Sequence, residues 1–237
     1  MPTFSHLRGV LFDIDGTLVD SNDAQAHAWV VALEGEGWWL PFELVRSKIG
    51  EGAGKILRDL VNVDADSVLG QTIARHRLEI FKTSYLADLS AFPEVRPLLA
   101  TMVACGLSLH VASSATSWEI HELLRVAGVS DLFQHVDHKD DAARSKPDPD
   151  IVETALARSG LSADEVLLVG DTPYDIEAAH LAGVSVVAVR SGGHWSDDDL
   201  WGAEEIYDDV ADILAHWTSS LFSPRATLRP ARQSASM

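Results

Sequence analysis

The chain has 237 residues, 46% of them hydrophobic, which is enough for one substantial domain or for a core domain with an insertion. Its 36 acidic residues outnumber 18 lysines and arginines, and the net charge of -18 argues against binding to nucleic acid or to an anionic membrane. Cys105 is the only cysteine, so an intrachain disulfide is excluded and a cytoplasmic location is favoured.

The sequence contains no obvious targeting or membrane segment. Residues 1–10 hold no long apolar run, so we expect no signal peptide. No stretch approaches the eighteen or so uninterrupted apolar residues that a transmembrane helix needs.

Short apolar runs alternate with helical patterns along the chain. The runs predict strands at residues 10–12, 107–112, 133–136, 166–169 and 184–189. The patterns predict helices at residues 23–33, 95–104, 117–127, 150–159 and 174–182. Because each strand is continuously apolar, we expect an α/β fold with a parallel sheet that is covered on both faces.

A helical block interrupts this alternation directly after the first strand. Helical patterns at residues 43–49, 55–60 and 67–86 contain no convincing strand between them. We therefore expect a cap domain over residues 21–91, inserted into a core domain made of residues 1–20 and 92–217. Residues 218–237 are rich in Ser, Ala, Pro and Arg, and we expect a disordered tail there.

Two carboxylates follow the first strand, where ligands bind in open parallel sheets. Asp13 and Asp15 repel each other unless a cation lies between them, which suits a divalent metal and phosphate chemistry. Asp13 can attack phosphorus. Asp15 lies on the same side of an extended chain as Asp13 and can donate a proton to the leaving oxygen. The simpler alternative is a helix cap or a solvated turn.

Other polar groups follow the later strands and loops. Ser113 ends the second strand, and its hydroxyl can hold a phosphoryl oxygen together with the amide of Ser114. Lys146 stands in a proline-rich loop, where a fixed cation can neutralise nucleophile and phosphate. Asp171 and Asp175 are four residues apart, share a helix face and are typical magnesium ligands. Each of these residues alone has an ordinary alternative as a helix cap or a solvated side chain.

Taken in chain order, the segments DIDGTLVDS, VASSAT, SKPDPD and GDTPYDIEAAHLAG resemble the four motifs of the haloacid dehalogenase superfamily. The helical insertion resembles the small cap of phosphoglycolate phosphatases and β-phosphoglucomutases. The resemblance implies a Rossmann-like core and Mg2+ as cofactor. It implies Asp13 as nucleophile and Asp15 as general acid and base.

The same resemblance implies the ligands of the phosphoryl group and of the metal. The implied phosphate ligands are Ser113, Ser114 and Lys146. The implied metal ligands are Asp13, Asp15 through its backbone carbonyl, Asp171, and Asp175 directly or through water. The dehalogenase branch lacks the second aspartate of the first motif, so the presence of Asp15 argues against dehalogenation.

We therefore expect a Mg2+-dependent phosphatase that acts on a small phosphorylated metabolite through an aspartyl phosphate. The alternative is a sugar phosphomutase similar to β-phosphoglucomutase. Those mutases carry a histidine where Gln25 stands and an acidic pair where Gly170 and Asp171 stand, so both differences favour the phosphatase. A catalytically inactive binding protein is a third alternative, but no residue of the four motifs is lost.

The glycine-rich segment IGEGAGK at residues 49–55 is the predicted specificity element of the cap. Glu51 and Lys55 are its candidates for contact with the substrate, and a flexible helix connection is the alternative. Phosphonoacetaldehyde hydrolases use a cap lysine as a Schiff base, but Lys48 and Lys55 have no context that favours this chemistry. The sequence leaves open the identity of the substrate and whether the protein is a monomer or a dimer.

Overall fold

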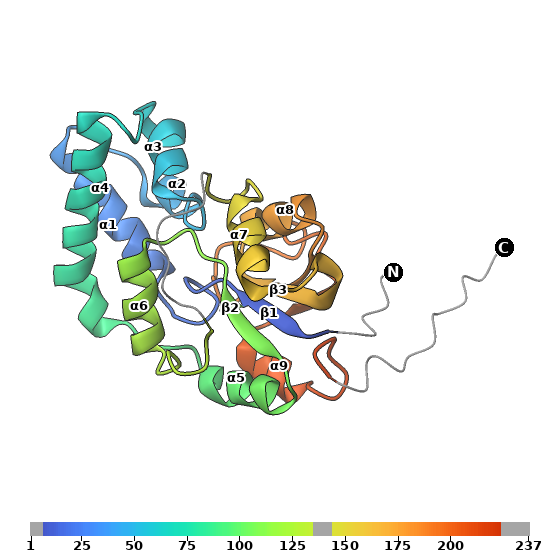
Figure 1. Ribbon diagram of the computed structural model, residues 1–237. Coiled ribbons are helices and arrows are strands. Elements are labelled where there is room, and N and C mark those ends of the chain that lie inside the picture. The colour runs from blue at the N-terminus through green and yellow to red at the C-terminus, as the bar shows by residue number, and fades with distance from the viewer. Residues whose placement is uncertain (1–6, 135–143, 224–237) are drawn as a thin grey trace.

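The computed structural model describes residues 7–134 and 144–223 (Figure 1). Within these ranges, five strands form one parallel sheet in the order β2-β1-β3-β4-β5. The strands are β1 (Gly9–Phe12), β2 (Ser108–Val111), β3 (Val166–Gly170), β4 (Ser185–Val189) and β5 (Glu205–Tyr207). The predicted α/β class with a parallel sheet is confirmed.

The register of the central strands fixes where the site forms. Phe12 at the end of β1 lies opposite Val111 of β2 and Val169 of β3. The three strands therefore end at the same edge of the sheet, and the residues that follow each of them lie near one another.

The prediction of a strand at residues 133–136 is wrong for residues 133 and 134, which the structure describes. Phe133 and Gln134 lie in a bend, and the rest of the segment lies outside the described residues. The Phe133 ring packs edge-on against Phe12 at a centroid distance of 6.1 Å, so its apolarity reflects core packing. The sheet instead contains β5 at one of its edges, whose three residues are only half-buried and form no continuous apolar run.

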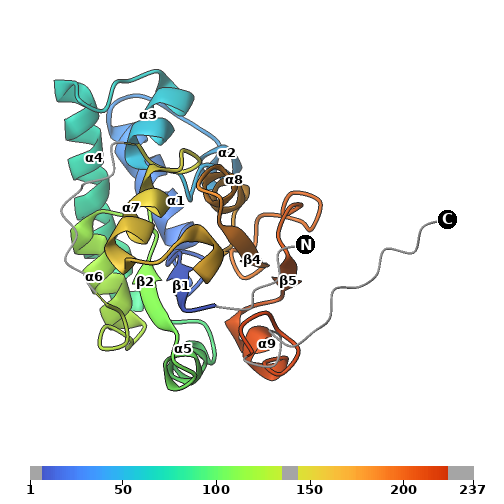
Figure 2. The same cartoon turned by 45° about the vertical axis from the view of Figure 1, so that its right-hand side comes forward.

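Helices cover both faces of the sheet (Figure 2). One face packs against α5 (Val95–Ala104), α6 (Ser117–Val126) and α9 (Val210–Ala215), and the other against α7 (Asp150–Ser159) and α8 (Pro173–Leu181). Side chains alternate along β1, so Val10 and Phe12 join the first apolar cluster and Leu11 joins the second. A short 3-10 turn, Ala163–Glu165, precedes β3.

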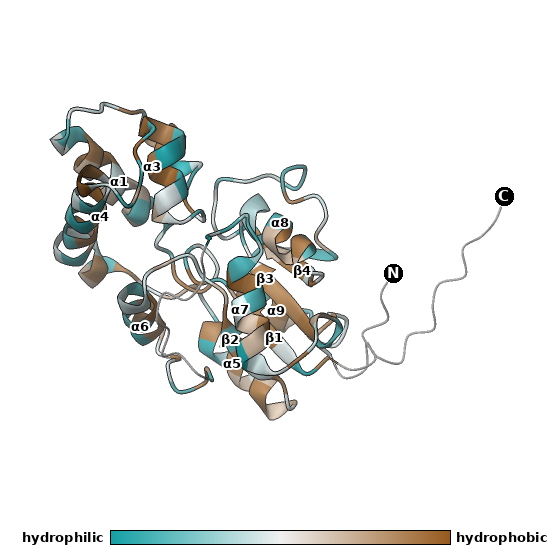
Figure 3. Cartoon of the chain, turned by 45° about the horizontal axis from the view of Figure 1, so that its top comes forward, coloured by the Kyte–Doolittle hydropathy of each residue, from teal (hydrophilic) through white to brown (hydrophobic). Residues whose placement is uncertain are grey.

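The chain between β1 and α5 is helical. It forms α1 (Asn22–Gly35), α2 (Phe42–Arg46), α3 (Ala53–Val61) and α4 (Val68–Ile80), then a π-helical segment (Phe81–Tyr85) and a 3-10 turn (Leu86–Asp88). These helices stand together beyond the sheet edge (Figure 1) and enclose an apolar cluster of their own. In Figure 3, α3 and α4 carry both brown and teal segments, whereas β3 is brown.

The two connections of this helical insertion run side by side. The amide of Asp20 donates to the carbonyl of Ser90 at 3.0 Å, and the amide of Phe92 donates to the carbonyl of Leu18 at 3.1 Å. The insertion is thus joined to the core through a short paired segment. Among the described residues, none of the helices combines the length and the apolar composition needed to cross a lipid bilayer.

The end of the described chain differs from the predicted tail. Residues 218–223 pack against the core: Ser220 is fully buried, and Phe222 is 2% exposed and stacks on Trp217. Composition alone does not reveal that Phe222 anchors this segment in the core. Residues 224–237 lie outside the described residues.

Candidate active site

Three buried aspartates meet at the edge where the central strands end. Asp13 follows β1, Asp171 follows β3, and Asp175 lies in the first turn of α8. One carboxylate oxygen of each lies within 4.8 Å of the others, and each residue is at most 3% exposed. The sheet register and the four-residue spacing of Asp171 and Asp175 thus bring these predicted residues together.

Lys146 provides the positive charge of this cluster. Its Nζ donates to Asp13 Oδ1 at 2.8 Å and to Asp175 Oδ1 at 2.5 Å, and the lysine side chain is fully buried. Burial by itself lowers the pKa of the ammonium group. The carboxylates of Asp13 and Asp175 outweigh this effect and raise the pKa of Lys146, which therefore stays protonated.

The aspartates carry more negative charge than Lys146 neutralises. Burial raises the pKa of Asp13 to about 7, with Lys146 opposing and Asp175 adding to the rise. Burial and the charges of Asp175 and Asp13 also raise the pKa of Asp171 well above its usual range. Three ionised carboxylates and one ammonium group leave an excess of two negative charges in a buried site. This excess and the hard oxygen donors fit a divalent cation.

Neighbouring residues fix the orientation of Asp171. Thr17 Oγ1 donates to Asp171 Oδ1 at 3.2 Å, and Asn22 Nδ2 donates to Asp171 Oδ2 at 2.9 Å. Gly16 has φ +74, and a Cβ there would lie 2.3 Å from Asp171 Oδ2, so only glycine fits at this position. Gly16 and Thr17 directly follow Asp15 in the sequence, but in the structure they position the carboxylate of Asp171.

Asp15 does not join the three-carboxylate cluster through its side chain. Its Oδ1 accepts from Ser21 Oγ at 2.5 Å and from Gln25 Nε2 at 2.9 Å. Burial raises the pKa of Asp15, and these two hydrogen bonds oppose the rise. The carboxyl group therefore faces the N-terminal part of α1 rather than the other aspartates.

The predicted phosphate ligands after β2 lie beside the glycine-rich loop of the insertion. Ser113 Oγ accepts from the amide of Ala115 at 3.2 Å, and Ser114 Oγ donates to the carbonyl of Gly50 at 3.0 Å. Gly50 has φ +108, and a Cβ there would lie 2.9 Å from a side-chain carbon of Thr172. The loop therefore rests closely on the core, and its glycines permit this approach.

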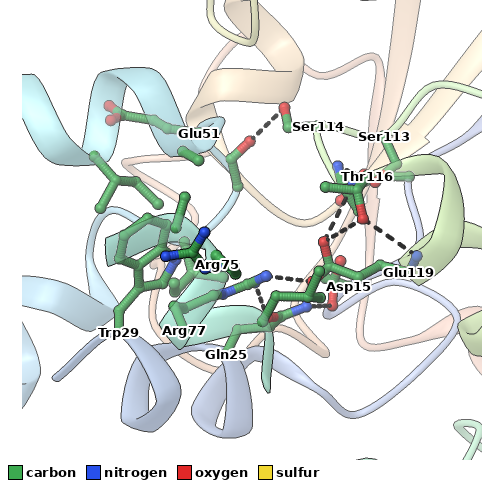
Figure 4. A pocket seen from close by; sticks show the side chains of 18 residues that line it. Asp15, Gln25, Trp29, Glu51, Arg75, Arg77, Ser113, Ser114, Thr116 and Glu119 are labelled. Atoms are coloured by element: carbon green, nitrogen blue, oxygen red, sulfur yellow. Dashed lines mark hydrogen bonds and ion pairs between the residues drawn. The ribbon is translucent and has the colours of Figure 1, made fainter. Parts of the chain in front are cut away.

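A cavity of about 270 Å3 opens between the sheet edge and the insertion (Figure 4). Its core wall includes Asp13, Asp15, Ser113, Ser114 and Glu119. Its opposite wall comes from α1, the loop at residues 49–53, α3 and α4, and includes Gln25, Trp29, Ile56, Arg75 and Arg77. A group bound at Asp13 would therefore extend toward the insertion.

The two predicted specificity residues differ in their positions. Glu51 lines the cavity, is 8% exposed, and pairs with Lys48 through Oε1 at 3.3 Å. Lys55 is not among the lining residues and pairs with Asp148 at 2.7 Å. Sequence reasoning missed Arg75 and Arg77, which line the cavity from α4. Both lie in a long helical pattern, and this pattern does not indicate which face of the helix borders the cavity.

The chain is similar to known proteins over most of its length. Residues 10–189 match the family model of haloacid dehalogenase-like hydrolases. A phosphoglycolate phosphatase of Yersinia pestis is 33% identical over 202 residues, which cover 83% of this chain and 87% of that protein. One of Rhodospirillum rubrum is 31% identical over 214 residues, covering 87% and 89%. The solved structure of a hydrolase from Pseudomonas syringae has a TM-score of 0.82 and 27% identity, covering 90% of this chain and 98% of that one.

Proposed function

Because the chain belongs to the haloacid dehalogenase-like hydrolase family and is a phosphatase, we propose that it hydrolyses a small phosphomonoester with Mg2+ through an aspartyl phosphate on Asp13. The observation that carries the proposal is the position of Lys146, whose Nζ contacts both Asp13 and Asp175 beside a cavity. A cation held there by two carboxylates suits the binding of a phosphoryl group next to a nucleophile.

The first step transfers the phosphoryl group to the protein. A carboxylate oxygen of Asp13 attacks phosphorus and forms the new P–O bond. The bond from phosphorus to the leaving oxygen breaks, and Asp15 gives its proton to that oxygen. Lys146, Ser113 and Ser114 hold the phosphoryl oxygens during the transfer.

The second step releases phosphate. A water molecule attacks phosphorus, and Asp15, now a carboxylate, accepts a proton from this water. The bond between phosphorus and Asp13 breaks, which frees inorganic phosphate and restores both carboxyl groups. The insertion limits access of bulk water to the site in the first step.

The metal ligands in this proposal are Asp13, the backbone carbonyl of Asp15, Asp171 and Asp175. Mg2+ held by these residues would offset the excess negative charge and, by polarising a P–O bond, would make phosphorus easier to attack. The proposal is supported by the three buried carboxylates whose oxygens lie within 4.8 Å of one another.

The test is phosphate release from p-nitrophenyl phosphate with Mg2+. Asp13→Asn removes the nucleophile, and we expect turnover to fall at least about a thousandfold, in line with the loss of a catalytic nucleophile. Asp20→Asn is the matched control, because Asp20 is exposed on the connection to α1. Circular dichroism checks that both variants are folded. An Asp13→Asn variant with wild-type turnover would refute the mechanism.

A screen of phosphorylated metabolites with Mg2+ then addresses the substrate. Phosphoglycolate is the first compound to include, because the relatives above are named for it. β-Glucose 1-phosphate with a catalytic amount of glucose 1,6-bisphosphate is included for the phosphomutase alternative. Formation of glucose 6-phosphate without free phosphate would favour that alternative.

A further inference from the structure

Arg77 on α4 connects the insertion with both sides of the site (Figure 4). Its Nη2 donates to Gln25 Oε1, and Gln25 Nε2 donates in turn to Asp15 Oδ1 at 2.9 Å. Its Nη1 pairs with Glu119 on α6. Glu119 also accepts from the amide and the hydroxyl of Thr116, at 3.2 and 2.8 Å. The chain of contacts thus runs from the loop after β2, through α4, to Asp15.

The guanidinium group of Arg77 is held firmly in this position. The Arg77 side chain is 12% exposed and that of Glu119 is 2% exposed. The guanidinium carbon lies 5.5 Å from the ring centroids of both Trp29 and Phe81. One ion pair with Glu119, one hydrogen bond to Gln25 and two aromatic contacts leave the group little freedom to reorient.

Arg77 dictates which end of the Gln25 amide faces Asp15. A glutamine side chain has an acceptor oxygen at one end and a donor nitrogen at the other, whereas arginine can only donate. The oxygen of Gln25 must therefore face Arg77, and the NH2 group must face Asp15. Without Arg77, the amide can turn over and present its oxygen to the Asp15 carboxyl group, which would lose a donor.

We propose that Arg77 is a positioning residue that acts through Gln25 to hold the Asp15 carboxyl group for proton transfer to the leaving oxygen. Because Arg77 belongs to the insertion, this arrangement is complete only when α4 lies against α6 and the core. The inference rests on the proposed function, since it needs Asp15 as the general acid.

The experiment compares two substrates that differ in how much they need a proton from the enzyme. Phenyl phosphate releases a phenolate whose conjugate acid has a pKa of about 10, so its departure depends on general-acid catalysis. The leaving group of 2,4-dinitrophenyl phosphate departs without a proton. The measured quantity is kcat/KM with Mg2+, because it includes the transfer of the phosphoryl group to Asp13.

For Arg77→Met and Gln25→Met we expect kcat/KM to fall about a hundredfold with phenyl phosphate, the range of a lost general-acid contribution. With 2,4-dinitrophenyl phosphate we expect little change. Arg77→Lys keeps a donor toward Gln25 and should recover part of the loss. The double variant should be no worse than either single variant, because both break the same chain of contacts.

Arg58→Met is the matched control, because Arg58 is exposed on α3 and does not line the cavity. Removing Arg77 leaves the buried Glu119 without its ion-pair partner, so folding is checked by thermal melting. Gln25→Met provides a variant that keeps the Arg77–Glu119 pair. An equal loss with both substrates in the folded variants would overturn the inference and leave the proposed function standing. A wild-type enzyme that releases no phosphate from either substrate would overturn both.

Discussion

Gly192 illustrates how closely the loops of the site pack around the carboxylates. A Cβ at this position would lie 1.8 Å from Asp171 Oδ2, far closer than any real contact. Arg46 of α2 also donates to the carbonyl of Gly192, so the loop has little room to withdraw. The packing of this loop therefore fixes the position of Asp171.

We expect Gly192→Ala to lower Mg2+-dependent turnover of p-nitrophenyl phosphate about a hundredfold, because a displacement near 1 Å can cost that much. The added methyl group forces the Asp171 carboxylate away from Thr17 and Asn22. Gly54→Ala is the control, because a Cβ there meets its nearest neighbour at an ordinary 3.5 Å. Unchanged turnover in Gly192→Ala would show that the loop moves to accommodate the methyl group without displacing Asp171, contrary to this prediction.

The roles of some of these residues can be predicted from the sequence more easily than the roles of others. Asp13 and Asp171 directly follow apolar strands, and the rule for parallel sheets predicts that such residues share an edge. Gly192 carries no functional group, and a Gly-Gly pair after a strand resembles any turn. Its role depends on a contact with a residue twenty-one positions away, which no local pattern records.

At the scale of elements, the core depends on residues that the strand pattern misassigns. Phe133 is 7% exposed in the larger apolar cluster, although it lies in a bend. β5 pairs with β4 through Val187 and Glu205, yet it contains a charged residue and no buried one. Short apolar runs indicate burial more reliably than they indicate a strand, because packing and backbone pairing are separate requirements.

Phe133→Ala tests how much this segment contributes to the core. Removing a buried ring leaves a cavity next to Phe12, and we expect the free energy of unfolding to fall by about 3–5 kcal/mol. Urea titration followed by tryptophan fluorescence measures the change. Gln134→Ala is the control, because this side chain is exposed and should change stability by less than about 0.5 kcal/mol. Equal effects of the two variants would contradict the described packing.

At the scale of the whole molecule, the last described segment closes the core near α9. Phe222 belongs to the same apolar cluster as β1 and α5, and its ring stacks on Trp217 at 6.4 Å. Composition predicts disorder from residue 218 because serine, proline and arginine dominate there. The burial of Phe222 nevertheless orders this segment despite its polar composition, since a single buried ring contributes several kcal/mol.

We expect Phe222→Ala to destabilise the protein by about 3–5 kcal/mol, comparable to the loss of any fully buried ring. Thr218→Ala changes an exposed residue of the same segment and serves as the control. Both variants are compared with the wild type by thermal melting. A melting temperature of Phe222→Ala equal to that of the control would mean that the segment does not support the core in solution.

The metal site links the charge balance to the stability of the whole fold. Asp13, Asp171 and Asp175 come from distant parts of the sequence, and burial raises the pKa of Asp13 and Asp171. In the metal-free protein, these carboxylates repel one another in a buried site, which is unfavourable for the folded state. An ion that binds only the folded state stabilises it by about 2.7 kcal/mol at a hundred times its Kd.

For a chain of this size, that stabilisation corresponds to a rise in melting temperature of roughly 5–11 °C at saturating Mg2+. Asp171→Asn removes a ligand and a buried negative charge, so we expect its metal-free form to melt no lower than the wild type. Its Mg2+-dependent shift should be lost. Melting curves with MgCl2, with EDTA and with NaCl at matched ionic strength separate specific binding from screening. An equal Mg2+ shift in Asp171→Asn would place the ion elsewhere and remove the basis for the proposed metal ligands.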